Sequence, residues 1–138
     1  MDAFDRLTLE EIAGAVPDGA LLGVPADYSG VPMAATRALI ARGARDLRLF
    51  CLPYTTLQGD MLIGAGCVAS VEAAAVTLGE HGLAPRFTEG FTSGAFEMRD
   101  STCPALHAQL QATEKGVPFM PLRGSSARIS PPTGPTGR

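Results

Sequence analysis

The chain has 138 residues, of which 46% are hydrophobic and 18% are charged, and this is the composition of one folded domain with a sizeable core. Its formal net charge of -3 provides no basic surface for nucleic acid. No apolar run approaches the roughly 20 residues that span a membrane, and the acidic start Met1-Asp2-Ala3-Phe4-Asp5 does not resemble an export signal. We therefore expect a cytoplasmic protein that binds neither nucleic acid nor membrane.

The cysteines and histidines do not predict a metal site. Cys51, Cys67 and Cys103 are odd in number and follow no metal-ligand spacing, and only His81 and His107 accompany them. Reduced thiols are typical of a cytoplasmic protein. The sequence predicts no metal and no tightly bound cofactor.

Strand-like and helix-like segments alternate from the start of the chain. Thr8-Leu9-Glu10-Glu11 is a capping box that opens a short helix, and Pro17-Asp18-Gly19 ends this helix. The continuous apolar run Ala20–Val24 predicts a strand that is buried on both faces. A loop from Pro25 to Val31 follows, and Pro32 suits the first position of the next helix.

The same alternation continues to the end of the folded part. Leu47–Leu52 predicts a second strand, and Pro53–Thr56 predicts a loop at its carboxyl end. The pattern of Val68–Ala73 alone fits either a strand or a helix. The other later predicted elements are a helix at Leu57–Ala65, a turn at Gly79–Gly82, a short helix at Leu83–Glu89 interrupted near Pro85, a strand at Ala95–Arg99, a helix at Pro104–Lys115 with Leu106 and Leu110 inward, and an extended segment at Val117–Pro121. We predict an α/β domain in residues 1–124, an open and mostly parallel sheet with flanking helices, and a flexible tail in residues 125–138.

One glycine-rich stretch has two interpretations. Gly64-Ala65-Gly66-Cys67-Val68-Ala69 matches the G-x-G-x-x-G/A pattern of dinucleotide-binding proteins. Such a site needs a strand of about five apolar residues before the glycines and a helix after them. Here only Met61-Leu62-Ile63 precedes them, and Gly59-Asp60 interrupts this run. The alternative makes Leu57–Ala65 a helix that ends in a left-handed glycine and leads into a strand, and we favour it over dinucleotide binding.

Several short motifs follow one another in a fixed order between about Thr8 and Gly124. They are Asp18-Gly19-Ala20, Pro32-Met33-Ala34, Arg37-Ala38-Leu39, Ile63-Gly64-Ala65-Gly66-x-Val68, Leu83-Ala84-Pro85-x-Phe87 and Gly116-Val117-Pro118-Phe119-x-Pro121-x-Arg123-Gly124. In this order and spacing they resemble the A subunit of the type I CoA-transferases, in the branch of glutaconate CoA-transferase and the CoA-dependent ring-opening hydrolases of steroid degradation. The resemblance implies a heterodimer or heterotetramer with a B-type subunit and an acyl-CoA substrate at the interface between them.

The resemblance also implies catalytic positions. The nucleophilic glutamate of the transferases belongs to the B-type subunit, so we expect it on a partner chain. In the ring-opening branch, a glutamate just before the last helix acts with an arginine, and these positions hold Cys103 and Arg123 here. We take Arg123 and Cys103 as candidate catalytic residues, because an arginine can bind a carboxylate or phosphate and a helix N-terminus favours a thiolate. An exposed arginine and an inert packed thiol are the structural alternatives.

Most candidate substrate-binding residues lie at the ends of predicted strands or on the loops that follow them, where α/β sheets usually bind ligands. Glu80 lies in a turn and is a candidate because it can act as an acid or base. The family has a glycine-rich loop after the first strand, whereas a proline here fills the space and removes a backbone donor. This departure, and a length about half that expected of an A subunit, support an alternative hypothesis of a non-catalytic structural or acyl-CoA-binding subunit. The candidates are Gly23, Val24, Pro25, Tyr54, Thr55 and Glu80.

Overall fold

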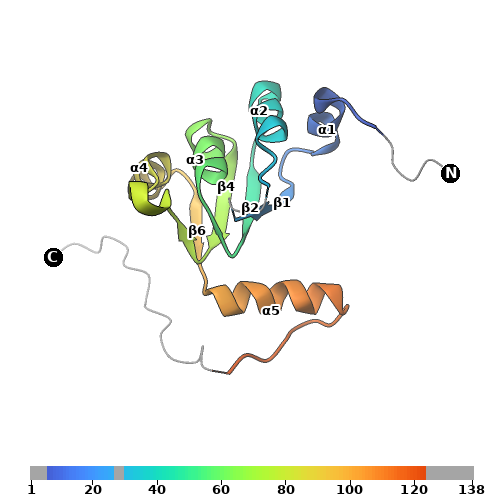
Figure 1. The fold of residues 1–138 in the computed structure, drawn as a ribbon, viewed down its shortest axis with the longest axis vertical. Coiled ribbons are helices and arrows are strands. Elements are labelled where there is room, and N and C mark those ends of the chain that lie inside the picture. The colour runs from blue at the N-terminus through green and yellow to red at the C-terminus, as the bar shows by residue number, and fades with distance from the viewer. Residues whose placement is uncertain (1–5, 27–29, 124–138) are drawn as a thin grey trace.

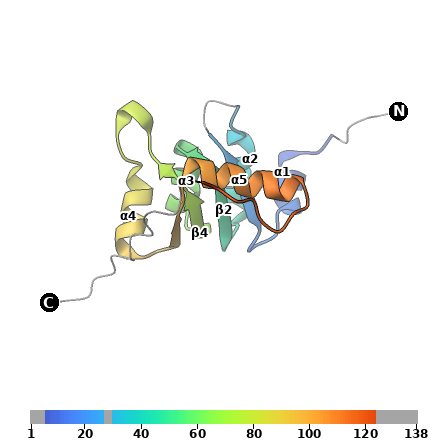
Figure 2. The same ribbon diagram turned by 90° about the horizontal axis from the view of Figure 1, so that it is seen from below.

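The computed structural model describes residues 6–26 and 30–123, and it shows an α/β fold built in layers (Figures 1 and 2). Helices α1 to α4 lie on one face of a parallel sheet, and α5 crosses the other face. The predicted tail at residues 125–138 lies outside the described residues. The elements are α1 (Leu9–Ala15), β1 (Leu21–Pro25), α2 (Met33–Arg42), β2 (Leu47–Leu52), β3 (Tyr54–Thr55), α3 (Leu57–Gly64), β4 (Val68–Ala73), β5 (Ala75–Val76), a 3-10 helix η1 (Gly79–His81), α4 (Pro85–Ser93), β6 (Glu97–Asp100) and α5 (Cys103–Glu114).

The main sheet has the strand order β1-β2-β4-β6, and every neighbouring pair is parallel. The predicted open parallel sheet is therefore confirmed. The carboxyl ends of all these strands lie at the same edge of the sheet, because parallel strands share one direction.

A second, small sheet corrects the prediction of a loop at Pro53–Thr56. The two-residue strands β3 and β5 pair in parallel directly after β2 and β4. The backbone N–H of Ala74 donates to the Pro53 carbonyl at 2.9 Å, and that of Thr77 donates to the Thr55 carbonyl at 3.2 Å. Both chain segments therefore continue past the main sheet side by side.

The core lies between the sheet and the layer of α1 to α4. Alternate residues of β2 point into it: Leu47, Leu49 and Cys51 are each at most 1% exposed. The prediction that Ala20–Val24 is buried on both faces was wrong, because Leu21 is 63% exposed. β1 is an edge strand, and only its alternate residues, such as the fully buried Val24, reach the core.

Two helices depart from their predicted form. Pro85 begins α4 and does not interrupt it, since a missing N–H is tolerated in the first turn. In α5, Leu106 is fully buried as predicted, whereas Leu110 is 45% exposed. A residue four positions further on is turned by about 40° around the helix. Gln109 marks the side of α5 that faces the sheet, because its side chain donates to Glu72 of β4. The rotation of about 40° moves Leu110 away from that side.

The glycine-rich stretch is a helix end. Gly66 has φ 70°, its backbone N–H donates to the Ile63 carbonyl at 2.9 Å, and that of Cys67 donates to the Leu62 carbonyl at 3.1 Å. This pair of bonds is the Schellman motif that commonly ends a helix. The order helix, glycine, strand is the reverse of a dinucleotide site, so the helix-cap interpretation is confirmed. Gly64 also permits close helix packing, because a Cβ there would lie 2.8 Å from Cγ of Arg86 in α4.

Candidate functional site

The direction of the chain across the sheet reverses after β6. Right-handed crossovers through α2, α3 and α4 on one face carry the chain from β1 to β6. α5 leaves β6 on the opposite face, contacts β2 and runs back beneath the sheet toward β1 (Figures 1 and 2). In parallel α/β sheets, ligands bind at the carboxyl ends of the strands. The described strands follow one another in a single direction, and the carboxyl edge that they share is therefore the candidate site.

The carboxyl edge of the sheet comprises Val24–Ala26, Tyr54–Thr56 and Ala75–Val76. β3 contacts both β1 and β2 there, and it pairs with β5. Val24 and Thr55 are fully buried, and Val76 is 5% exposed, so these residues fix the positions of the strand ends. Pro25 and Tyr54 are half-buried, and they form part of the surface of this edge.

Five of the predicted site residues come together at this edge, and three do not. Gly23, Val24 and Pro25 belong to β1, whereas Tyr54 and Thr55 form the adjacent β3. The other three are exposed and lie on other elements: Glu80 in η1, Cys103 at the start of α5 after the far edge strand β6, and Arg123 beyond α5. Residues 27–29 of the predicted Pro25–Val31 loop lie outside the described part of the chain.

The corner between β3 and α3 is held by a side chain. Thr55 Oγ1 accepts a hydrogen bond from the backbone N–H of Gly59 at 3.2 Å. A Cβ on Gly59 would overlap Cγ2 of Thr55. Glycine at this position therefore lets the first turn of α3 approach β3 closely.

Two buried polar residues beside this edge were not among the predicted site residues. Gln58 in the first turn of α3 is 3% exposed, and Thr36 in α2 is 1% exposed. Gln58 Nε2 donates to Thr36 Oγ1 at 2.9 Å, and that hydroxyl donates to the Pro32 carbonyl at 3.1 Å. The hydroxyl hydrogen is thus already used, which fixes the orientation of the carboxamide. Gln58 Oε1 is buried and has no hydrogen-bond partner among the described residues.

Nothing in the sequence around Gln58 distinguishes it from an exposed glutamine near a helix start. Its burial depends on Thr36, which is 22 residues away in the chain. The buried carboxylate two residues later, Asp60, has a structural role: its Oδ1 accepts from the backbone N–H of Phe87 at 2.8 Å in the first turn of α4. Negative charge at that position is favourable because the helix N-terminus is partly positive.

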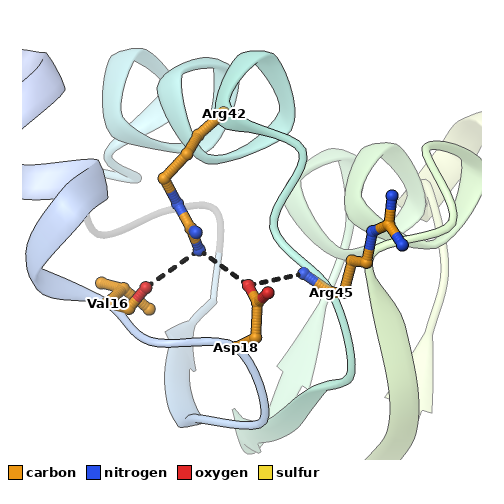
Figure 3. Close-up of polar contacts among 4 residues, drawn as sticks. All are labelled: Val16, Asp18, Arg42 and Arg45. Atoms are coloured by element: carbon orange, nitrogen blue, oxygen red, sulfur yellow. Dashed lines mark hydrogen bonds and ion pairs between the residues drawn. The ribbon is translucent and has the colours of Figure 1, made fainter.

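The amino edge of the sheet, which comprises the segments before β1, β2 and β4, is organised around Asp18 (Figure 3). Asp18 Oδ1 accepts from Arg42 Nη2 at 3.2 Å and from the backbone N–H of Arg45 at 3.1 Å. Arg42 Nη2 also donates to the Val16 carbonyl at 2.9 Å. The Arg45 N–H, together with Arg42, lowers the pKa of Asp18 below its ordinary value. These bonds tie the approach to β1 to the approach to β2.

Comparison with known proteins decides the fold. No protein-family model and no curated protein matches the chain by sequence. Among solved structures, it is similar to the decarboxylase AibA/AibB, with 30% identity, a TM-score of 0.71 and coverage of 83% of this chain and 45% of that chain. It is also similar to glutaconate coenzyme A-transferase from Acidaminococcus fermentans, with 24% identity, a TM-score of 0.77 and coverage of 88% and 39%.

The chain has the fold of the CoA-transferase subunits. It spans less than half the length of either matched chain. The resemblance inferred from the short motifs is thereby confirmed at the level of the fold. Roles for Arg123, Cys103 and the carboxyl edge in chemistry or binding stay predictions.

Two further features, a membrane-spanning helix and a metal site, were sought among the described residues. Within residues 6–26 and 30–123, no helix has the length and apolar character needed to cross a bilayer. The same part of the chain brings no three His, Cys, Asp or Glu side chains into a group that would hold a metal ion.

Proposed function

We propose that this chain is an A-type subunit of a heteromeric CoA-transferase or CoA-dependent hydrolase, and that its carboxyl edge forms part of an acyl-CoA site. The fold carries the proposal, because one matched structure is a coenzyme A-transferase and the other, the decarboxylase AibA/AibB, is named for two kinds of subunit. The shared direction of the strands supports the location, since ligands of parallel α/β sheets bind at the carboxyl ends of the strands.

The composition of the carboxyl edge supports a partner subunit. The described residues of this edge, Val24–Ala26, Tyr54–Thr56 and Ala75–Val76, contain no aspartate or glutamate, and Asp27 lies outside the described part of the chain. A nucleophilic carboxylate for attack on the thioester is therefore expected from a B-type chain seated against this edge. In this arrangement, the chain's own residues bind and orient the acyl-CoA, and the partner supplies the covalent chemistry.

Co-expression with a candidate B-type subunit tests the proposal. We expect a stable complex that releases CoA from an acyl-CoA, measured with a thiol reagent, while each chain alone is inactive. Addition of a free carboxylic acid separates the two reactions, because a transferase forms a new CoA ester and a hydrolase does not. Absence of a complex, together with no heat of binding for CoA or its esters in calorimetry, would rule the proposal out.

A non-catalytic role is the second candidate, and Pro25 and Cys103 favour it. Pro25 ends β1 where the related enzymes are expected to have a glycine-rich loop, and Cys103 replaces an expected glutamate. Arg123→Ala in the reconstituted complex distinguishes the two roles, with Arg37→Ala on the exposed side of α2 as the matched control. A fall in turnover of roughly a hundredfold or more for Arg123→Ala alone would establish a catalytic role, and unchanged turnover would support a passive one.

A further inference from the structure

The described residues of the carboxyl edge carry no positive charge. The described segments that follow β1, β2 and β4, residues 25–26, 30–32, 53–56 and 74–78, contain no lysine, arginine or histidine. The surface of these residues is instead apolar or bears hydroxyl groups. Pro25 and Tyr54 are half-buried, Ala75 is exposed, and Leu57, the first residue of α3, is 49% exposed.

The arginines near the sheet are held elsewhere. Arg42 bonds to Asp18 at the amino edge (Figure 3), and Arg48 Nε donates to the Gly19 carbonyl at 3.2 Å on the same side. Arg99 of β6 pairs with Glu97 at 3.0 Å, on the strand farthest from β1. Each of these cations already has an acceptor that neutralises or binds it, and none is at the end of β1 or at β3.

An independent feature beside this edge also disfavours an anion. The buried Gln58 Oε1 is an unpaired acceptor between the first turns of α2 and α3, the helices that begin at this edge. An acceptor oxygen is repelled by a carboxylate and attracts an N–H or O–H donor. Its orientation is fixed by Thr36, so the carboxamide does not turn its NH₂ group outward to meet an anion.

We propose that the acyl group received at this edge is uncharged, so that the substrates are CoA thioesters of monocarboxylic acids and not of dicarboxylic acids. The inference rests on the proposed function. A second carboxylate on the acyl chain would lose water here without gaining an ion pair, and such desolvation is unfavourable. The alkyl end of a monocarboxylic acyl group is instead stabilised when it leaves water, and it packs against Pro25, Tyr54 and Leu57.

Pentanoyl-CoA and glutaryl-CoA test the inference directly, since both acyl groups have five carbons and differ only in a terminal methyl or carboxylate. Calorimetry on the assembled complex is expected to show pentanoyl-CoA binding about tenfold or more tightly, a difference of about 1.4 kcal/mol. Equal affinity, or tighter binding of glutaryl-CoA, overturns the inference and leaves the proposed function intact. If neither ester nor free CoA binds, the proposed function itself fails.

A charge placed at the edge locates the acyl group. Ala75→Lys adds a cation at an exposed position of β5, and it is expected to shift the preference toward glutaryl-CoA by about tenfold. Ala65→Lys is the matched control, because it adds the same charge at an exposed residue of the amino edge and leaves the preference unchanged. An equal shift in both variants, or in neither, places the acyl group away from the carboxyl edge.

Discussion

The two edges of the main sheet use polar groups in opposite ways. At the amino edge, the Asp18 carboxylate joins Arg42 and the Arg45 backbone, and these bonds connect the segments that lead into β1 and β2 (Figure 3). At the carboxyl edge, neither acids nor bases are present in Val24–Ala26, Tyr54–Thr56 or Ala75–Val76. The charged side chains at the amino edge therefore stabilise the fold, whereas these three segments of the carboxyl edge, where a ligand is expected, are uncharged.

Because of this difference between the edges, a shifted pKa is a poor guide to the candidate ligand site of this protein. Groups with shifted pKa values often mark active sites. Here the pKa of Asp18 is lowered at the edge opposite to the one where α/β sheets bind ligands. The direction of the strands identifies the candidate site, whereas the shifted pKa of Asp18 marks the opposite, structural edge.

The largest effect on stability is expected at the carboxyl edge, from Gly59→Ala. The new methyl group would overlap Cγ2 of Thr55, which is fully buried, so β3 or α3 must shift. We expect a loss of about 1–3 kcal/mol in the free energy of unfolding, measured by urea denaturation. A loss of binding to CoA esters should accompany it if β3 lines the site.

Thr55→Ser tests this explanation as a suppressor. The serine removes the overlapping methyl and keeps the hydroxyl that accepts the Gly59 N–H. The double variant should therefore be more stable than Gly59→Ala alone, and a double-mutant cycle quantifies the coupling. Gly14→Ala in α1 is the control, since a Cβ there meets nothing within 4 Å. It should stabilise the protein by about 0.5–1 kcal/mol.

A smaller effect is expected at the amino edge, from Gly66→Ala. A Cβ on Gly66 has no neighbour within 4 Å, so the cost comes only from its left-handed backbone with φ 70°. This conformation costs about 1–2 kcal/mol for a residue with a side chain, and Gly66→Asn should lose less. Thermal denaturation of the two variants measures this order. Unchanged binding of CoA esters in the variants would show that the glycine stretch is not part of the ligand site. Selective loss of ligand binding with unchanged stability would contradict its role as a helix cap.

The sequence was sufficient for the parts of the fold that depend on local patterns. The capping box at Thr8, the strand Leu47–Leu52 and the glycine cap after α3 each depend on a few adjacent residues, and all were predicted. β3 and β5 were missed, because two residues show no periodicity and these strands exist only through pairing across about 20 residues. Exposure of Leu21 likewise depends on strand order, which local patterns do not determine.

The candidate site divides in the same manner. The location of Gly23, Val24, Pro25, Tyr54 and Thr55 at the carboxyl edge was predicted, because residues at the carboxyl ends of strands can be recognised without knowing their neighbours, and their role in binding stays a prediction. Gln58 was not predicted, since its burial depends on contact with Thr36 on another helix. Arg123 and Cys103 were assigned from the resemblance alone, and their distance along the fold from β1 leaves their roles to experiment.

A pH-dependent effect is expected from Asp18→Asn at the amino edge. The pKa of Asp18 in the folded protein lies below its ordinary value of 3.8, chiefly through the Arg45 N–H and then through Arg42. A lowered pKa stabilises the folded protein above the unfolded value, and this contribution disappears as the pH falls through the folded value. The melting temperature of the variant should therefore be lower than that of the wild type near pH 7, and the two should converge below about pH 4. A difference that stays constant down to pH 3 would show that the carboxylate's charge contributes nothing.

The three cysteines differ in exposure, so their reactivity can be compared in the native protein without changing its stability. Cys51 is fully buried in β2, and burial, with a smaller contribution from Glu72, raises the pKa of its thiol to about 12. Cys67 is 2% exposed and burial raises its pKa as well, whereas Cys103 is exposed at the start of α5. Because the thiolate is the reactive form, iodoacetamide at pH 8 should label Cys103 alone, and Cys103→Ser should remove this labelling.

Mass spectrometry of the native protein counts the modified thiols, and protection of Cys103 only in the complex would show that the partner covers the start of α5. Rapid labelling of Cys51 in the native protein would contradict the packing of β2 at the centre of the core.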